Sequence, residues 1–252
     1  MDTSNLLAFT AMGLSVIGFF LNLLLIIGLL SSRRLRSVVT TPMVIAVSMG
    51  DFLWSLLVLP VLAARFYSRS WDTAVGSCSV FPVLELVILG ASVLSLMCIV
   101  INRTCLLFFQ ERVKKYFSLR TSLLLTLLCW LFPLLLLAPS ITGSWGQIKL
   151  DNITQGCVIM EDSDGGSPLV VFNNVIFIIP LLTMFICIIM DFIKLGIGSK
   201  GERTTCSEAM FFLMLLLIFV MFLFCFLPGF LLANLDPCYD YPILHAIAYI
   251  TI

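Results

Sequence analysis

Charged side chains are scarce in this sequence. Its 252 residues include 14 lysines and arginines and 14 aspartates and glutamates, so 11% are charged whereas 61% are hydrophobic. Soluble domains carry roughly 25% charged residues, which keep their surfaces hydrated. The composition therefore excludes a soluble globular protein and predicts one that lies in a membrane.

Groups that enzymes use for catalysis are also few. There is one histidine, and the sequence has no His-Glu-x-x-His or Gly-x-Ser-x-Gly motif, no glycine-rich phosphate loop and no Cys-x-x-Cys pair. Asp51 and Glu85 are the two acids expected within the membrane, and their positions do not predict a catalytic pair. We expect neither an enzyme nor a nucleic-acid-binding protein, and no required cofactor.

Hydrophobic residues form six long runs, at approximately residues 8–30, 42–64, 78–108, 121–139, 169–195 and 209–235. Each run reaches or nearly reaches the ~20 residues that a transmembrane helix requires. A seventh run, at 241–252, would measure only about 18 Å as a helix, too short to cross a bilayer. We predict one all-α domain over residues 1–252, a seven-transmembrane bundle with a truncated seventh helix, as in a fragment or shortened isoform.

Basic residues are sorted between the two sides of the predicted bundle. Arg65, Arg69 and Lys149 are the only basic residues on one side, and all others fall in the alternate connections. Lysine and arginine accumulate on the cytoplasmic side of membrane proteins. The N-terminus is therefore predicted to be extracellular. The first run lacks a signal-peptide cleavage site and is expected to be retained.

Two cysteines differ in position from those inside the apolar runs. Cys78 opens the third run and Cys157 lies in the long connection after the fourth run. Both are extracellular in the predicted topology, where a disulfide persists, so we predict that they are bridged. Asn152 begins a glycosylation sequon on the same side. The cysteines within the runs are expected to act as small hydrophobic residues: Cys98, Cys129, Cys187 and Cys225.

Characteristic residues follow one another along the runs in a fixed order. They are Gly18 and Asn22; Ser48 and Asp51; Trp71 before Cys78; Asn102-Arg103-Thr104; Trp130 and Pro139; Pro180; and Cys225-Phe226-Leu227-Pro228. This order resembles that of the rhodopsin-like (class A) G-protein-coupled receptors. The resemblance covers essentially the whole chain. It implies a multi-pass plasma-membrane receptor that binds an extracellular ligand and a heterotrimeric G protein.

A narrower resemblance concerns the segment before Cys157. The stretch at 145–151, Ser167-Pro168, Asn102 and the stretch at 226–229 are similar to an arthropod subgroup, the moody and trapped-in-endoderm receptors.

The resemblance assigns G-protein coupling to the end of the third run. Arg103 is the expected coupling residue, while Asn102 replaces an acid and Thr104 replaces a tyrosine of the family triplet. These replacements imply a less tightly held resting state and weaker aromatic packing. Glu208 stands where the family often places a partner for the arginine. The residues alone equally allow Glu208 to be a solvated acid at a helix start.

An aromatic stripe on the sixth run is the expected conformational switch. Phe222 and Phe226 share a helical face, and Pro228 removes a backbone hydrogen bond and favours a hinge. Residue types alone also allow plain packing. The resemblance favours the switch role for Phe226 and Pro228.

Two buried acids are candidates for binding. Glu85 lies seven residues after Cys78 and either pairs with a cationic ligand group, forms a structural hydrogen bond, or pairs with His245. Phe226 is a further candidate ligand contact. The resemblance implies that Asp51, with Ser92 and Asn22, binds a sodium ion through oxygen ligands. The alternative is a protonated, hydrogen-bonded Asp51.

The residues also allow other functions. A non-signalling receptor remnant is the main alternative, and a transporter or channel is another, although the sequence has no internal repeat. A retinal-binding pump would need a lysine in the seventh helix. The basic second inner connection is expected to contact the G protein or anionic membrane lipids: Arg112, Lys114, Lys115 and Arg120.

Overall fold

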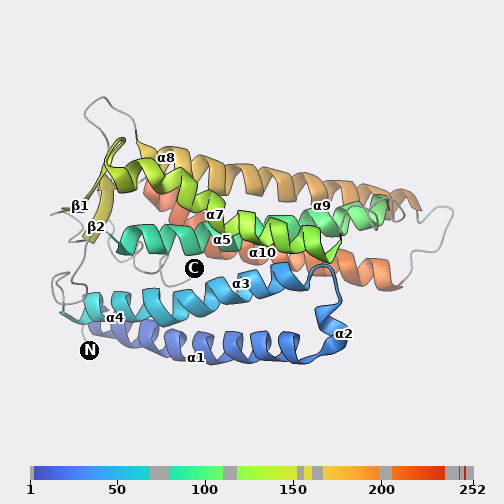
Figure 1. The fold of residues 1–252 in the computed structure, drawn as a ribbon, viewed down its shortest axis with the longest axis horizontal. Helices are drawn as coiled ribbons and strands as arrows, with labels where there is room; N and C mark the ends of the chain where they lie inside the picture. The colour runs from blue at the N-terminus through green and yellow to red at the C-terminus, as the bar shows by residue number, and fades with distance from the viewer. Residues whose placement is uncertain are drawn as a thin grey trace.

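The computed structural model describes residues 3–68, 80–109, 118–151, 156–160, 167–198 and 206–235, together with 244 and 247. Within these residues, six helical spans are long and apolar enough to cross a membrane. They lie roughly parallel and form a bundle (Figure 1). The predicted all-α membrane fold is confirmed. Of the seventh run, only Leu244 and Ile247 are described, and both are helical.

The spans correspond to the six predicted runs. They are α1 (Thr3–Ser31), α3 with η1 and α4 (Thr41–Leu53, Trp54–Val58 and Leu59–Ser68), α5 (Phe81–Phe108), α7 (Leu119–Thr142), α8 with η2 and α9 (Pro168–Asn173, Asn174–Ile178 and Ile179–Gly198), and α10 (Cys206–Leu235). Helices satisfy every backbone hydrogen bond internally, as a bilayer interior requires. The 28 residues of α5 measure about 42 Å, longer than the hydrocarbon core of a bilayer.

The third span begins later than predicted and the first begins earlier. The prediction began at 78, whereas α5 begins at Phe81 with Val80 as its N-cap. Pro82 occupies the first turn, where its missing N–H costs no helical hydrogen bond. The first span begins at Thr3 rather than at residue 8.

Two spans contain a wide turn immediately before a proline. In η1 the Leu59 N–H donates to the carbonyl of Trp54, and Pro60 follows. In η2 the Ile179 N–H donates to the carbonyl of Asn174, before Pro180. A proline has no N–H to donate and crowds the preceding turn, and one extra residue in that turn relieves the crowding. Both spans therefore remain continuous through their prolines.

A β-hairpin covers one end of the bundle, which we name the hairpin end (Figure 1). Its strands β1 (Gln147–Asp151) and β2 (Gly156–Met160) pair antiparallel, with Leu150 opposite Cys157. This hairpin was not predicted from the sequence. The short helix α2 (Arg33–Arg36) lies at the opposite end, between α1 and α3. We name that opposite end the Arg103 end.

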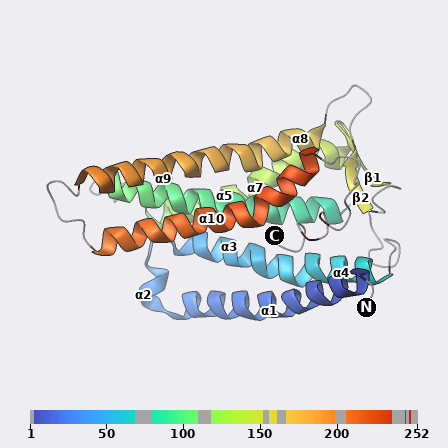
Figure 2. The same ribbon diagram turned by 180° about the vertical axis from the view of Figure 1, so that it is seen from behind.

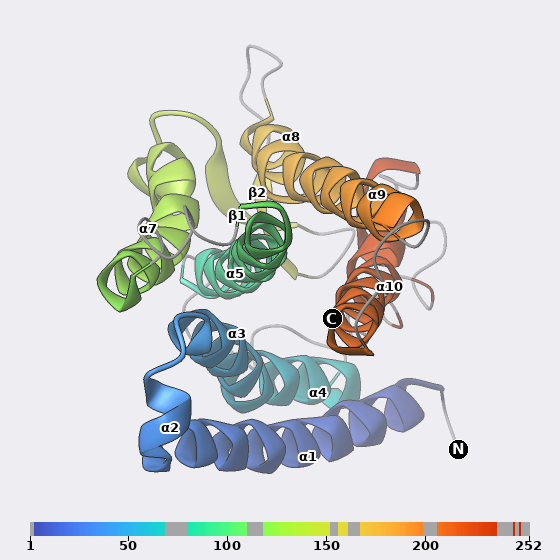
Figure 3. The ribbon, with the colours of Figure 1, turned by 90° about the vertical axis from the view of Figure 1, so that its right-hand side faces the viewer.

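Helix α5 runs through the middle of the bundle and forms its core (Figure 3). In its most apolar stretch 56% of the residues are buried, against 11% for α1 and for α10. Close helix packing depends on two glycines. A β-carbon at Gly90 would lie 2.8 Å from Pro133 of α7, and one at Gly50 would lie 2.0 Å from the Ser92 hydroxyl. Small residues allow such close approach between transmembrane helices.

Candidate functional site

Three consecutive residues near the Arg103 end of α5 make different contacts. Successive helical residues point about 100° apart, so neighbours in the triplet Asn102-Arg103-Thr104 face different helices. Nη2 of Arg103 donates a hydrogen bond of 3.1 Å to Oγ1 of Thr40. Thr40 directly precedes α3 and is buried. This bond ties the end of α5 to the start of α3.

Thr104 ties the same helix to α9. Its hydroxyl donates a hydrogen bond of 3.0 Å to Oδ2 of Asp191. Thr104 is 5% exposed and Asp191 only 1% exposed. A carboxylate inside a membrane span is costly and is a functional candidate by default. Thr104 replaces the tyrosine of the family triplet but still supplies a hydroxyl, and this hydroxyl has a buried partner.

Asp191 corrects the expectation that Asp51 and Glu85 are the only acids within the membrane. It lies in α9, inside the span that extends from Pro168 to Leu195. The apolar run predicted at 169–195 already contained this acid, so the signal was present in the sequence. Its contact with Thr104 joins positions 87 residues apart and could not be read from the run itself.

Lys194 forms a second attachment between α9 and α5. Its ammonium donates to the backbone carbonyl of Leu107 and lies 4.7 Å from the centroid of the Phe108 ring. Carbonyls in the last turn of a helix lack helical partners, and a lysine can satisfy one of them. The contact over the ring adds a cation–π attraction. Lys194 is thus part of α9 and not a loop residue.

Asn102 is enclosed by the protein. It is 1% exposed, and neither its amide nitrogen nor its oxygen has a hydrogen-bond partner among the described residues. Asn102 stands where the family has an acid, so a neutral side chain replaces the neighbour that would pair with Arg103. Buried polar atoms without partners are costly. The Asn102 side chain therefore stabilises this end of α5 less than a hydrogen-bonded side chain would.

The aromatic stripe on α10 packs against α9, and these two helices lie side by side (Figure 2). The rings of Phe222 and Phe226 are 5.0 Å apart, and both side chains are buried. Phe177 of η2 contacts Phe226 and Phe230 at 6.0 and 6.1 Å. Pro228 lies inside α10. The predicted grouping of aromatic residues around this proline is present.

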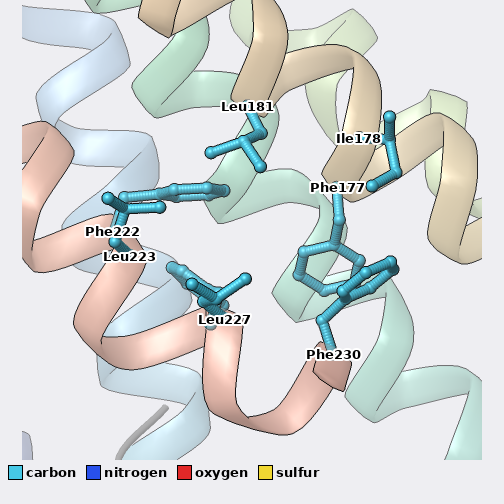
Figure 4. Close-up of a pocket in the computed structure, with 8 residues that line it drawn as sticks. Phe177, Ile178, Leu181, Phe222, Leu223, Leu227 and Phe230 are labelled. Atoms are coloured by element: carbon cyan, nitrogen blue, oxygen red, sulfur yellow. The ribbon is translucent and has the colours of Figure 1, made fainter. Parts of the chain in front are cut away.

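These aromatic residues line an apolar groove between α10 and the η2–α9 segment. Figure 4 shows the rings of Phe177 and Phe230 beside each other and Leu181 facing Phe222. The remaining lining residues are Ile178, Leu223, Phe226 and Leu227. The groove carries no polar group, so any rearrangement of α10 here exchanges one set of apolar contacts for another.

The two acids predicted from sequence lie in different surroundings. Glu85 of α5 is 9% exposed, and a buried carboxylate there keeps its candidacy for ligand contact. The Asp51 side chain is exposed within the described part of the chain. Asn22 donates its amide to the carbonyl of Gly18 in its own helix, and Ser92 packs closely against Gly50. The sodium site at Asp51, Ser92 and Asn22 stays a prediction.

Comparison with known proteins identifies the family. The sequence matches the family described as 7 transmembrane receptor (rhodopsin family) over residues 21–251. This chain belongs to the rhodopsin family of receptors. Members of this family are non-enzymatic G-protein-coupled receptors that pass several times through the membrane. The resemblance expected from the ordered residues of the runs is confirmed.

Curated relatives agree with the arthropod resemblance. The receptor is 30% identical to the protein trapped in endoderm-1 of Drosophila melanogaster, over 92% of this chain and 67% of the relative. It is 28% identical to the G-protein coupled receptor moody of the same species, over 73% of this chain and 28% of the relative. It is 24% identical to melatonin receptor type 1B-A of Danio rerio, over 85% of this chain. The chain spans about a quarter of moody and about two thirds of trapped in endoderm-1.

Several predicted site residues of the receptor lie outside the described part. Glu208 is in the first turn of α10, but its side chain is not among those described, so its bridge to Arg103 stays a prediction. Cys78, Asn152 and His245 also lie outside. Cys157 is disulfide-bonded, and its pairing with Cys78 stays a prediction. The cysteines at 98, 129, 187 and 225 are free, as expected, and so is Cys105 of α5.

Proposed function

We propose that this receptor transmits an extracellular ligand signal to a heterotrimeric G protein by rearranging the helices around Arg103 and α10. The observation that carries the proposal is the hydrogen bond from Arg103 to Thr40. Through this bond, the cation at the end of the most buried helix donates to a neutral hydroxyl. A hydrogen bond to a neutral acceptor is weaker than one to an ionised acceptor, so a partner with carboxylate groups can compete with Thr40 for the guanidinium.

The orientation of the receptor follows from its charges. Arg33, Arg34 and Arg36 are exposed in α2 at the Arg103 end, and we place this end in the cytoplasm. The hairpin end, with the disulfide-bonded Cys157, then lies outside the cell, where disulfides persist. We further propose a plasma-membrane location, with contacts from exposed arginines to anionic lipid headgroups.

The ligand would bind between the spans toward the hairpin end. We propose Glu85, Phe226 and His245 as its contacts, with Glu85 facing a cationic group of the ligand. Glu85 is buried in α5, and Phe226 is buried where α10 packs against η2. A ligand that contacts both helices differs in affinity between two packings of the bundle. A difference of a few kcal/mol is enough to change which packing dominates.

The response would pass along α10. Pro228 interrupts the backbone hydrogen bonding of this helix and makes it a hinge. The contact between Phe222 and Phe226 lies on the Arg103 side of this hinge. Bending there would move the first turns of α10, which contain Glu208, relative to Arg103. Opening of this end would expose Arg103 to the G protein.

The test is heterotrimer dissociation in cells expressing the full-length protein, measured without ligand across the Gα classes. Arg103→Ala is expected to abolish the response, because the guanidinium is the proposed contact with the G protein. Arg36→Ala is the matched control, since it removes an exposed arginine at the same end of the bundle. Equal signalling by the parent and Arg103→Ala would remove Arg103 from the mechanism. A silent parent at normal surface expression would favour a non-signalling receptor.

A further inference from the structure

We propose that Asp191 is a positioning residue for coupling: through Thr104 it fastens α5 to α9 and keeps Arg103 directed toward Thr40, which favours the resting arrangement. This inference rests on the proposed coupling role of Arg103. Asp191 acts through Thr104, and it need not touch the G protein.

The first support is the hydrogen bonding of Asp191. Its Oδ2 accepts from the hydroxyl of Thr104, whereas its Oδ1 is buried and has no hydrogen-bond partner among the described residues. Among the described residues the buried carboxylate thus has a single hydrogen-bond donor, and losing it is costly. Movement of α5 away from α9 would remove that donor, so the bond opposes the movement.

The second support is Lys194, which is three residues after Asp191. Residues three apart in a helix face the same side, so both side chains of α9 point toward α5. Lys194 donates to the Leu107 carbonyl and lies over the Phe108 ring. We name Thr104, Leu107, Asp191 and Lys194 the α5–α9 clasp. Two attachments along one helix resist rotation as well as separation.

The third support is the sequence position of the arginine. Arg103 and Thr104 are consecutive, so fixing the side chain of one determines where the other points. Thr104 is held on α9, and Arg103 then reaches Thr40 on the other side of α5. Rotation of the last turns of α5 would break both hydrogen bonds together. The α5–α9 clasp therefore controls the direction of the guanidinium without contacting it.

The signalling test compares ligand-independent heterotrimer dissociation among single variants at matched surface expression. Asp191→Leu and Thr104→Val each remove the hydrogen bond and are expected to raise basal activity about fivefold, the shift that one hydrogen bond produces. Asp191→Asn keeps an acceptor for the hydroxyl and should stay close to the parent. Thr183→Val is the matched control, because the hydroxyl of this threonine of α9 donates to the Ile179 carbonyl in its own helix.

The double variant separates positioning from ordinary stabilisation. Thr104→Val leaves a buried carboxylate without its donor and should lower the melting temperature most. Adding Asp191→Leu should restore much of that loss, while basal activity stays about as high as in either single variant. The proposal would be overturned if the basal activity of the double variant equalled that of the parent or fell below it. It would also be overturned if that activity reached the product of the increases seen in the two single variants. A change in melting temperature without a change in signalling would do the same.

A distance measurement keeps this inference distinguishable from the proposed function. Spin labels at Phe109→Cys and Phe192→Cys, both exposed in the parent, report the separation of α5 and α9 at the Arg103 end. Asp191→Leu is expected to broaden the distribution of this distance, and Thr183→Val is not. A parent that activates no G protein would contradict the proposed function. In that case an unchanged distance overturns the role of Asp191, and a broadened one supports the α5–α9 clasp.

Discussion

Arg103 and Thr40 are 63 positions apart in the sequence and are joined by a hydrogen bond of 3.1 Å between Nη2 and Oγ1. Thr40 is the N-cap residue of α3, yet its side chain makes no capping bond to that helix. The hydroxyl is instead an acceptor for a cation from the central helix. The start of α3 is thereby coupled to the position of Arg103, so movement of either residue alters the contact of the other.

Thr40→Val is expected to raise ligand-independent G-protein activation about fivefold, because it removes one acceptor of the Arg103 guanidinium. Valine keeps the volume of threonine, so packing around α3 should change little. Heterotrimer dissociation in cells measures the effect. Thr10→Val is the control, since the Thr10 hydroxyl bonds to the Leu6 carbonyl in its own exposed turn. An activity equal to the parent would show that this bond does not restrain Arg103.

Gly90→Ala tests the close packing of α5 against α7. The added β-carbon would lie 2.8 Å from Cγ of Pro133, a rigid ring that cannot move aside. Overpacking of this kind costs about 1–3 kcal/mol. The same change at Gly13 in α1 meets nothing within 4 Å and should be neutral or stabilising, because alanine favours helix by about 1 kcal/mol over glycine. Thermal unfolding in detergent should separate the two variants, and equal melting temperatures would contradict the packing seen here.

Composition was sufficient to predict the spans of this receptor. A helix in lipid must be long and apolar, and both requirements are local properties of the sequence. The wide turns before Pro60 and Pro180 were not predicted, and Pro133, Pro139 and Pro228 lie inside helices without such a turn. The hairpin had a readable signal that was missed, since Ile148 and Leu150 alternate with polar residues in β1.

The contacts at the Arg103 end were not predictable in the same way. The partner of Thr104 lies 87 positions away and the donor to Leu107 equally far. Those pairings depend on which faces of α5 and α9 meet, and the apolar pattern of α9 does not specify a face. Asp191 could be recognised as an acid in a membrane span, but its partner required the packed bundle.

Cys157→Ser tests the disulfide formed by strand β2 of the hairpin. Loss of a native disulfide typically costs about 2–5 kcal/mol, so the variant should show lower surface expression and a lower melting temperature. Cys225→Ser, which changes a free cysteine in α10, is the control and should change stability less. Mass spectrometry of the unreduced parent identifies the partner, which we predict to be Cys78. A linked peptide that contains any other cysteine would refute that pairing.

Phe222→Ala and Phe224→Ala test which face of α10 meets the bundle. Phe222 is 4% exposed and packs on Phe226, whereas Phe224 on the same helix is 67% exposed. Removing a buried phenylalanine costs about 3–5 kcal/mol, because transfer and cavity terms add. Removing a ring that faces lipid leaves no cavity, and the melting temperature should stay near that of the parent. Comparable losses from both variants would place the helix in a different rotation, and the apolar groove beside Phe177 would then lose its structural basis.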